Sequence, residues 1–513
     1  MDSTERKDGR SAGGDPVRRS DAGDPGPAPA GGTDLRRALA APRVRRRGWR
    51  PGGVPATLVL LLLAAALGTA ARPLKSPRDV AGITRALAAG PHAGECDRCH
   101  TMHGNDLIPQ PNALVGPNDN TLCDNCHTVP WDGGSYAGTW IYAGSAHGNS
   151  PAMIWPGPDP MARTEPGAAG KCLNCHDPHG WDDATGRIPF LAVAREEKLC
   201  LACHAGNPAT SDVRSDLLKP YRHPVLDYTG RHAGPGESQP SDFGISPLNQ
   251  RHSECEDCHN PHVARTDPVG PPAPPDASKR LLGVSRVAVL NGSAGSAPSF
   301  TFLAASDTLT TPVAEYQLCF KCHSSWTVQP GGQTDLALVL NPGNPSYHPV
   351  EDRGRNPVID PLAFTTGWNA SSLVTCGDCH GSDLGTRGPH GSIYPHILKK
   401  SYPDSPGLRA TTSDELCFSC HAYDVYANPG APDVMRAASR FNTPGAGQGH
   451  AEHVGTSQVP CVACHTTHGS TTLPHLVVTG RSPGLVTYTE TANGGTCAPT
   501  CHGTASYTVN YAR

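Results

Sequence analysis

Apolar positions are distributed unevenly along the chain. Residues 1–52 are rich in Gly, Pro, Asp and Arg and show no hydrophobic period, which predicts a disordered, basic N-terminal region. An uncharged, Leu- and Ala-rich stretch from Gly52 to Ala71 then follows five arginines. This pattern predicts that residues 53–71 are the core of a secretory signal peptide cleaved near Ala70 or Ala71, or an uncleaved N-terminal anchor. In both cases the rest of the chain is exported.

From residue 92 onward the apolar pattern predicts only short elements. Short helices are expected at 194–199 and 412–415, the second with the spacing of a capping box. Pro- and Gly-rich composition predicts long loops at 205–250 and 324–375. Short β ribbons are expected at 281–305, 484–490 and 505–511.

Composition argues against a conventional hydrophobic core. Only 37% of the residues are hydrophobic and 5% aromatic, while Gly (57) and Pro (52) make up over a fifth of the 513 residues. Such a chain would be disordered unless something else supplied apolar surface.

A repeated cysteine motif indicates a bound group that would supply this apolar surface. C-x-x-C-H occurs nine times, and this pattern is typical of covalent c-type haem attachment. On a helical turn the two cysteines and the histidine share one face, so both thiols and the imidazole can reach one haem. The cysteine pairs are Cys96/Cys99, Cys123/Cys126, Cys172/Cys175, Cys200/Cys203, Cys255/Cys258, Cys319/Cys322, Cys376/Cys379, Cys417/Cys420 and Cys461/Cys464. The motif histidines are His100, His127, His176, His204, His259, His323, His380, His421 and His465.

A tenth site has one extra residue, with Cys497, Cys501 and His502. Positions i and i+4 still share a helix face, although Pro499 disfavours a regular helix there. The ten sites use all 20 cysteines. Zinc also binds paired C-x-x-C motifs, but zinc sites do not require the His that follows every pair here. We therefore expect ten covalently attached haems c.

The motifs come in pairs, which divides the exported part into five predicted dihaem repeats. A further His follows the first motif of each repeat, and Leu precedes most second motifs. The predicted repeats are 92–150, 151–250, 251–350 with an insert at 264–310, 351–450 and 451–513.

With these pairs the chain resembles the doubled-CxxCH family of multihaem cytochromes, over roughly residues 92–502. The resemblance implies bis-histidine haems stacked in a row and held by short helices, long loops and a few β ribbons. Five pairs are also similar to decahaem periplasmic or outer-membrane conduit cytochromes, and extracellular cytochrome filaments are a second similar group. The spacing at Cys497/Cys501 departs from the family motif.

Bis-histidine ligation requires ten more of the 25 histidines. Five follow a first motif, namely His103, His179, His262, His390 and His468. Five precede a pair, namely His92, His147, His223, His348 and either His450 or His453. His223 and His348 share a His-Pro-Val context, whereas His252 occupies a place similar to that of His92, just before Cys255. His232, His252, His396, His475 and the other of His450 and His453 remain as surplus.

The charge of the chain and the type of its expected iron ligands restrict the functions that it can have. Residues 1–71 carry 12 Lys or Arg and 7 Asp or Glu, and the remainder carries 30 and 39, which argues against nucleic acid as a partner. Only five Met are present, so Met ligation is not expected, and bis-histidine haems have low potentials.

We therefore expect a non-enzymatic electron-transfer protein in the periplasm, at the outer membrane or outside the cell. The expected partners are redox proteins and an outer-membrane porin-like barrel, or further copies in a filament. The alternatives are a multihaem reductase, whose open haem would be the one at His502, and a structural filament subunit.

Overall fold

The computed structural model describes residues 96–101, 114–116, 120–127, 142, 144–150, 172–176, 196–227, 253–309 (except 269 and 271), 313–356 (except 328, 330 and 331), 359–441 and 449–509. The chain divides into two compact units, Met1–Pro73 and Leu74–Arg513, and all described residues belong to the second. The predicted disordered region and the signal peptide or anchor lie outside the described residues, as do His92, His103 and His179.

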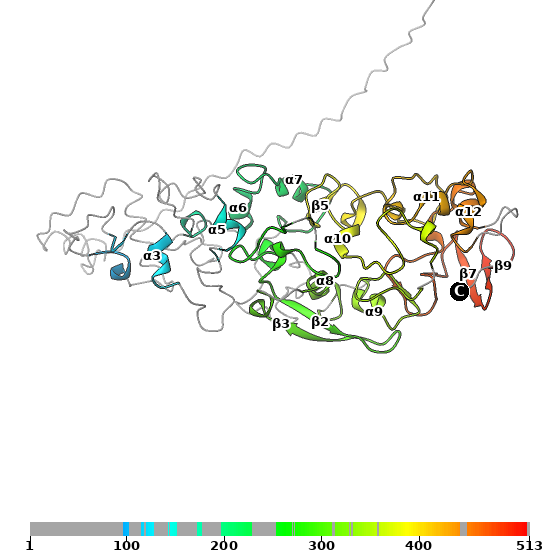
Figure 1. Ribbon diagram of the computed structural model, residues 1–513, viewed down its shortest axis with the longest axis horizontal. Helices are drawn as coiled ribbons and strands as arrows, with labels where there is room; N and C mark the ends of the chain where they lie inside the picture. Colours follow the sequence, from blue (N-terminus) through cyan, green and yellow to red (C-terminus); the bar gives the residue numbers. More distant parts are fainter. Residues whose placement is uncertain are drawn as a thin grey trace, which may run out of the picture. The chain divides into compact units, whose positions relative to one another are not determined.

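The described helices are short and are joined by long irregular connections (Figure 1). None has more than the nine residues of α8, and none is long and apolar enough to cross a membrane. The α-helices are α3 (Asn120–Asp124), α5 (Ala146–Asn149), α6 (Glu196–Leu201), α7 (Val213–Leu217), α8 (Glu315–His323), α9 (Leu336–Leu340), α10 (Cys376–Cys379), α11 (Tyr423–Tyr426) and α12 (Asp433–Ala437). The 3₁₀ turns are η1 (Cys96–Arg98), η5 (Cys172–Asn174), η8 (Cys255–Asp257), η9 (Lys279–Leu281), η10 (Ala305–Thr308), η11 (Pro361–Ala363), η12 (Pro395–Ile397), η13 (Leu416–Ser419) and η15 (Cys461–Ala463), and η14 (Ala451–Thr456) is a π-helix.

The described strands form small antiparallel sheets. Three sheets have two strands, paired β1–β5, β2–β3 and β4–β6, and one has three strands in the order β7-β8-β9. The strands are β1 (Tyr221–Arg222), β2 (Arg286–Leu290), β3 (Ser299–Leu303), β4 (Ser346–Tyr347), β5 (Gly391–Ser392), β6 (Gly469–Ser470), β7 (Leu485–Thr491), β8 (Gly494–Pro499) and β9 (Ala505–Thr508).

Several predicted elements are found. Residues 281–305 contain the hairpin β2–β3, and β7 and β9 fall in the other two predicted ribbons. The helix predicted at 194–199 is α6. The helix predicted at 412–415 begins later, at Leu416, because Thr412 donates its N–H to the Glu415 carboxylate (3.2 Å) ahead of the first helical residue.

Two predicted loops contain structure. Asp212 caps α7 and Asp335 caps α9 by accepting backbone N–H groups of the first turn. Each helix leads through a proline into a two-residue strand, β1 or β4, that ends directly before a His-Pro-Val sequence. Pro and Gly thus mark the ends of short elements here and do not exclude them.

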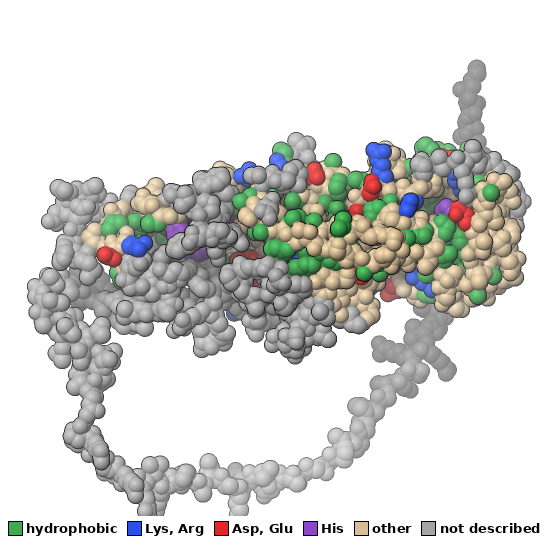
Figure 2. Space-filling model, turned by 90° about the horizontal axis from the view of Figure 1, so that it is seen from below, with side chains coloured by type: hydrophobic (Ala, Val, Ile, Leu, Met, Phe, Trp, Pro, Cys, Tyr) green, Lys and Arg blue, Asp and Glu red, His purple; other side chains and the backbone are tan. Residues whose placement is uncertain are grey.

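Buried apolar residues form small clusters. The first lies where β2 packs on α8 and α9, and its buried members are Val287, Phe320, Ala337, Leu340 and Val350 (Figure 1). The second and third lie around α11 and have three buried members each. On the face in Figure 2, charged side chains are scattered among the described residues and do not gather in one patch.

Candidate functional site

Nine of the ten motifs form a single helical turn. In eight of them the histidine N–H donates to the carbonyl of the first cysteine at 2.8 to 3.0 Å, and the ninth lies within α8. An i to i+4 hydrogen bond fixes the turn that places the two cysteines and the histidine on one side. The local geometry therefore suits one large ligand per motif.

The tenth motif is different. Cys497 lies in β8, where it pairs with Tyr488 on β7 and Ala505 on β9. The helical face considered for Cys497 and Cys501 is therefore wrong, because ladder hydrogen bonds hold this segment extended and Pro499 has no N–H for a helix. His502 follows the strand, and its Nδ1 donates to the carbonyl of Gly503 (2.7 Å).

Eight motif histidines lie opposite a second histidine, which we call the facing histidine. A metal about 2 Å from a nitrogen of each ring, with that nitrogen about 1 Å from its ring centre, would separate two ring centres by about 6 Å. The observed separations are 5.8 Å for His176–His262, 5.9 Å for His204–His147, 6.1 Å for His259–His390, 6.3 Å for His323–His223, 6.2 Å for His380–His468, 6.5 Å for His421–His348, 6.1 Å for His465–His450 and 6.2 Å for His502–His453. Each gap suits one metal ion bound by both rings.

The pairs follow a register that crosses repeat boundaries. The histidine after the first motif of one repeat faces the first motif of the preceding repeat, as His262, His390 and His468 do. The histidine ahead of a pair faces the second motif of that pair, as with His147, His223 and His348. Each of repeats 2 to 4 therefore takes one facing histidine from its successor.

Both candidate histidines ahead of the fifth motif pair face a motif histidine. His450 faces His465 and His453 faces His502, whereas only one of the two was expected to be a ligand. The available signal was their i, i+3 spacing, which puts two imidazoles on one side of a helix.

Several of these imidazoles are held through their other nitrogen. A carbonyl can only accept, so the Nδ1 atoms of His259, His380 and His465 donate to carbonyls of Arg280 (3.1 Å), His396 (2.8 Å) and His475 (2.9 Å). Among the facing histidines, His147, His223 and His348 donate to Pro261 (3.1 Å), Pro389 (2.7 Å) and Thr467. This bond fixes the ring and leaves Nε2 for a metal.

The surplus histidines His396 and His475 thus contribute main-chain carbonyls. Each follows a proline and starts a pair of residues with left-handed backbone, at φ 60° and 56° in one segment and 56° and 57° in the other. Such a conformation costs about 1–2 kcal/mol per non-glycine residue and is typical of functional sites. The repeated Pro-His-(Ile/Leu) sequence was the missed signal.

The two facing histidines of a repeat are tied together. The carbonyls that accept these bonds belong to Pro261, Pro389 and Thr467, which directly precede His262, His390 and His468. The ring of one facing histidine therefore binds the main chain next to the other facing histidine. In repeats 3 and 4 the ladders β1–β5 and β4–β6 reinforce this link, and His348 N–H also donates to His468 O at 2.8 Å.

Close packing explains the glycine after two of these histidines. A Cβ on Gly391 would lie 1.9 Å from the Asp216 carbonyl oxygen, and one on Gly469 would lie 1.8 Å from that of Val339. Real Cβ contacts are never this short, so α7 and α9 can approach these strands only where the side chain is missing.

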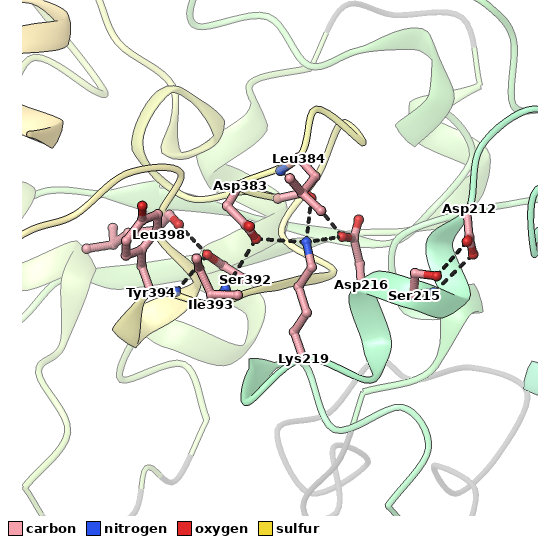
Figure 3. A network of polar contacts seen from close by, with 11 residues as sticks. Asp212, Ser215, Asp216, Lys219, Asp383, Leu384, Ser392, Ile393, Tyr394 and Leu398 are labelled. Atoms are coloured by element: carbon pink, nitrogen blue, oxygen red, sulfur yellow. Dashed lines mark hydrogen bonds and ion pairs between the residues drawn. The ribbon is translucent and has the colours of Figure 1, made fainter. Parts of the chain in front are cut away.

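A buried ion-pair network anchors the first of these ladders (Figure 3). Lys219 Nζ lies 2.7 Å from Oδ1 of both Asp216 and Asp383. Asp383 also accepts the N–H of Ile393 (3.2 Å), just after β5. Burial opposes the charge on Lys219, but the two aspartates raise its pKa above the ordinary value. The network therefore joins α7, the loop after His380 and β5.

Four of the facing imidazoles, those of His262, His390, His450 and His468, are neutral at neutral pH. Burial, followed by the charge of the histidine opposite, lowers the pKa of His262, His390 and His468 to about 4 and that of His450 to about 3. Only a neutral imidazole can bind a metal.

The motifs are linked across repeat boundaries through their first cysteines. Thiol hydrogen bonds join Cys200 to Cys255, Cys319 to Cys376 and Cys417 to Cys461. At two of these boundaries a glutamate also binds the main chain of the next motif. Buried Glu196 accepts the N–H of Glu256 (2.9 Å), and half-buried Glu315 accepts that of Gly377 (2.7 Å). Ligand atoms of Glu196, Cys200 and Cys255 lie within 4.8 Å of one another, but both thiols belong to attachment motifs.

Within repeats the second cysteines are close neighbours. A charge on one thiol of such a pair would raise the pKa of the other, for Cys175 with Cys203, Cys258 with Cys322, Cys379 with Cys420, and Cys464 with Cys501. The motifs from Cys172 to His502 therefore form one row in sequence order.

One continuous cavity of about 4030 Å³ follows this row. It is several times larger than an ordinary ligand pocket of roughly 300–1,000 Å³. Residues of nine motifs and all eight facing histidines line it. Its size, its regularly placed thiols and its facing imidazoles fit a series of haem groups and do not fit a single small ligand.

In the second motif of repeat 1, only two of the three predicted haem-binding residues line this cavity. Cys123 and His127 line the cavity, whereas Cys126 is exposed and lies outside the lining. This differs from the expectation that both thiols and the imidazole of a motif point into one enclosed site. At about 100° per residue, Cys126 lies about 60° to one side of Cys123 on the turn and His127 about 40° to the other. Cys126 is therefore at the edge of the face that this motif presents, and its attachment to haem stays a prediction.

Three other motif thiols are exposed, and their positions relative to the cavity differ. Cys379 and Cys501 are among the residues that line it, whereas Cys96 is not. Haem c is attached through the rim of the porphyrin, so a thiol at the border of the cavity can still reach its bonding partner.

Comparison with known proteins gives one match. The family model of the doubled CXXCH motif matches residues 165–209 and 371–425, which contain the motif pairs of repeats 2 and 4. Neither the curated proteins nor the solved structures include a match. The match and the motifs indicate a multihaem c-type cytochrome with covalently bound haem c and a role in electron transfer.

Proposed function

We propose that this chain is an exported decahaem cytochrome that carries electrons along a row of bis-histidine haems. The observation that carries the proposal is the set of eight facing imidazole pairs, with ring centres 5.8 to 6.5 Å apart, along motifs that are neighbours in sequence order.

Three groups of residues have different roles in holding the haems. The 20 cysteines would attach the porphyrins, the ten motif histidines would each bind one iron, and the eight facing histidines would each supply a second ligand at eight of the ten sites. When bound, haem c supplies a reversible one-electron couple at its iron. At these eight sites both imidazoles of a pair would bind the haem iron, which would leave no place for a substrate there.

The order of the row supports transfer over a distance. Contacts alternate between second cysteines within a repeat and first cysteines between repeats, without a break from repeat 2 to repeat 5. Neighbouring motifs in such contact hold their porphyrins close together. A periplasmic, outer-membrane or extracellular location, with redox proteins, a porin-like barrel or further copies as partners, is part of the proposal and rests on the N-terminal pattern.

The reductase alternative is weakened at its only predicted site. His453 lies opposite His502, with ring centres 6.2 Å apart, so this haem would also have two imidazole ligands. A reductase would need an open position there.

Haem counting and spin-state measurement test the proposal together. Mass spectrometry of the purified protein should show ten covalent haems, and low-temperature electron paramagnetic resonance should show low-spin iron throughout. A Cys497→Ser/Cys501→Ser variant should lose one haem. A colourless protein, or a strong high-spin signal from the unaltered protein, would contradict the conduit.

A further inference from the structure

His450 and His453, three positions apart, face the histidines of two different motifs. His450 precedes the π-helix η14 and lies opposite His465 (6.1 Å), while His453 within η14 lies opposite His502 (6.2 Å). His465 and His502 belong to the first and second motifs of the same repeat. One i, i+3 pair therefore serves both motifs of repeat 5.

In the other described repeats, the histidine opposite the first motif has a different origin. The first motifs of repeats 2, 3 and 4 are faced by His262, His390 and His468, each from the following repeat. In repeat 5, the place opposite the first motif is taken by His450, which lies directly before the repeat and not in a later one.

Packing holds His450 in this place. The rings of Tyr426 and Phe441 meet it edge-on, with centres 5.2 Å and 5.0 Å away. Gly455 allows η14 to pack against α11, because a Cβ there would lie 2.2 Å from the Ala427 carbonyl oxygen. The buried Nδ1 of His450 has no hydrogen-bond partner, so this nitrogen, like Nε2, is available to bind a metal.

We propose that His450 is the second axial ligand of the haem at Cys461/Cys464, so that repeat 5 is complete without a successor, whereas repeats 2 to 4 each depend on the next one. This inference rests on the proposed bis-histidine haems and adds a ligand and a direction of dependence.

The test counts high-spin haems in full-length variants. His450→Ala and His453→Ala should each open one haem, and the double variant should open two, as measured by electron paramagnetic resonance and by carbon monoxide binding to the reduced protein. Glu452→Ala is the matched control, because Glu452 lies in η14 between the two histidines but does not line the cavity, and its loss should open none.

A second pair of measurements separates ligation from packing. Added imidazole should restore the low-spin state of His450→Ala. His450→Met should stay low-spin with a raised potential for one haem, because methionine–histidine ligation raises the potential. A role in packing alone predicts neither change.

Two results would overturn the inference. One is His450→Ala with no high-spin haem, and the other is a double variant that opens only one haem, since the two histidines would then be alternatives for a single site. Both leave the proposed function intact if the unaltered protein keeps ten low-spin haems. A high-spin or haem-free unaltered protein would instead contradict the proposed function itself.

Discussion

A histidine in this chain acts through both of its ring nitrogens. In His223 and His380, Nδ1 donates to a main-chain carbonyl at 2.7 and 2.8 Å, and the ring faces another imidazole. Loss of such a supporting bond typically lowers metal affinity about 10–100-fold. The thiols and imidazoles select the cofactor, and the carbonyls fix the direction in which each imidazole points.

The lowered histidine pKa values predict resistance to mild acid. The pKa of His262, His390 and His468 in the folded chain is about 4, below the ordinary value of about 6.5 expected after unfolding. The unfolded chain therefore binds more protons as pH falls below about 6.5, and stability declines until the folded pKa is passed. Iron bound to the neutral ring can only move this limit lower.

A spectroscopic acid titration checks this expectation. The low-spin Soret band should persist from neutral pH and convert to high-spin only as pH falls through about 4 or below. A conversion centred near about 6.5 would show that the imidazoles are not enclosed.

At the scale of elements, two-residue ladders replace larger sheets. β1–β5 and β4–β6 each bring a His-Pro-Val segment beside a His-Gly-Ser segment, and so place two facing histidines together. Such short ladders are not stable alone. The helices α7 and α9, which pack against the strand glycines, supply the support.

Replacing a strand glycine should open a haem. Gly469→Ala puts a Cβ against the Val339 carbonyl, so we expect a loss of about 1–3 kcal/mol and displacement of His468. Thermal unfolding and electron paramagnetic resonance should show a lower Tm and a high-spin signal. Gly407→Ala is the control, because the nearest atom would be 3.7 Å away. Equal behaviour of the two variants would contradict the packing argument.

Lys219 should matter more than a nearby surface cation. Lys219→Met leaves Asp216 and Asp383 buried without their cation, and breaking such a pair costs about 3–5 kcal/mol. Arg222→Met removes a partly exposed pair with Asp227 and should cost less than about 1 kcal/mol. Denaturant unfolding monitored at the haem band measures both, and a similar small loss in the two variants would show that the network does not anchor β5.

At the scale of the whole molecule, apolar side chains alone provide little core within the residues that the structure describes. The clusters around α8 and α11 have five or three buried members each, while the row of motifs runs through the described part of repeats 2 to 5. Burial of the porphyrins is then the largest apolar contribution to folding, since stability follows the apolar area removed from water.

Folding should therefore depend on haem attachment. The chain produced without haem attachment should show no cooperative thermal transition and should be digested rapidly by protease, as small metal-dependent domains are without their metal. The haem-loaded chain under the same conditions should unfold cooperatively. A haem-free chain with the same Tm would mean that the side-chain clusters suffice.

Local sequence predicted the parts that depend on local geometry. The helical turns at nine motifs, the hairpin β2–β3 and the short β ribbons follow from spacing and alternation within a few residues. The extended backbone at Cys497 was mispredicted because pairing with the flanking strands β7 and β9 overrides the helical spacing of the two cysteines. The exposure of Cys126 was not predicted either, because spacing defines the turn but not how the turn is oriented toward the cavity.

The sequence by itself determined the cofactor chemistry, because covalent attachment needs two thiols and an imidazole within one turn. Tertiary structure alone decided which imidazole faces which motif and in what order the motifs meet. His468 faces His380, 88 positions earlier, because β6 pairs with β4 and α9 packs closely on Gly469. No local pattern contains such a contact, since it depends on how distant segments pack around a shared cavity.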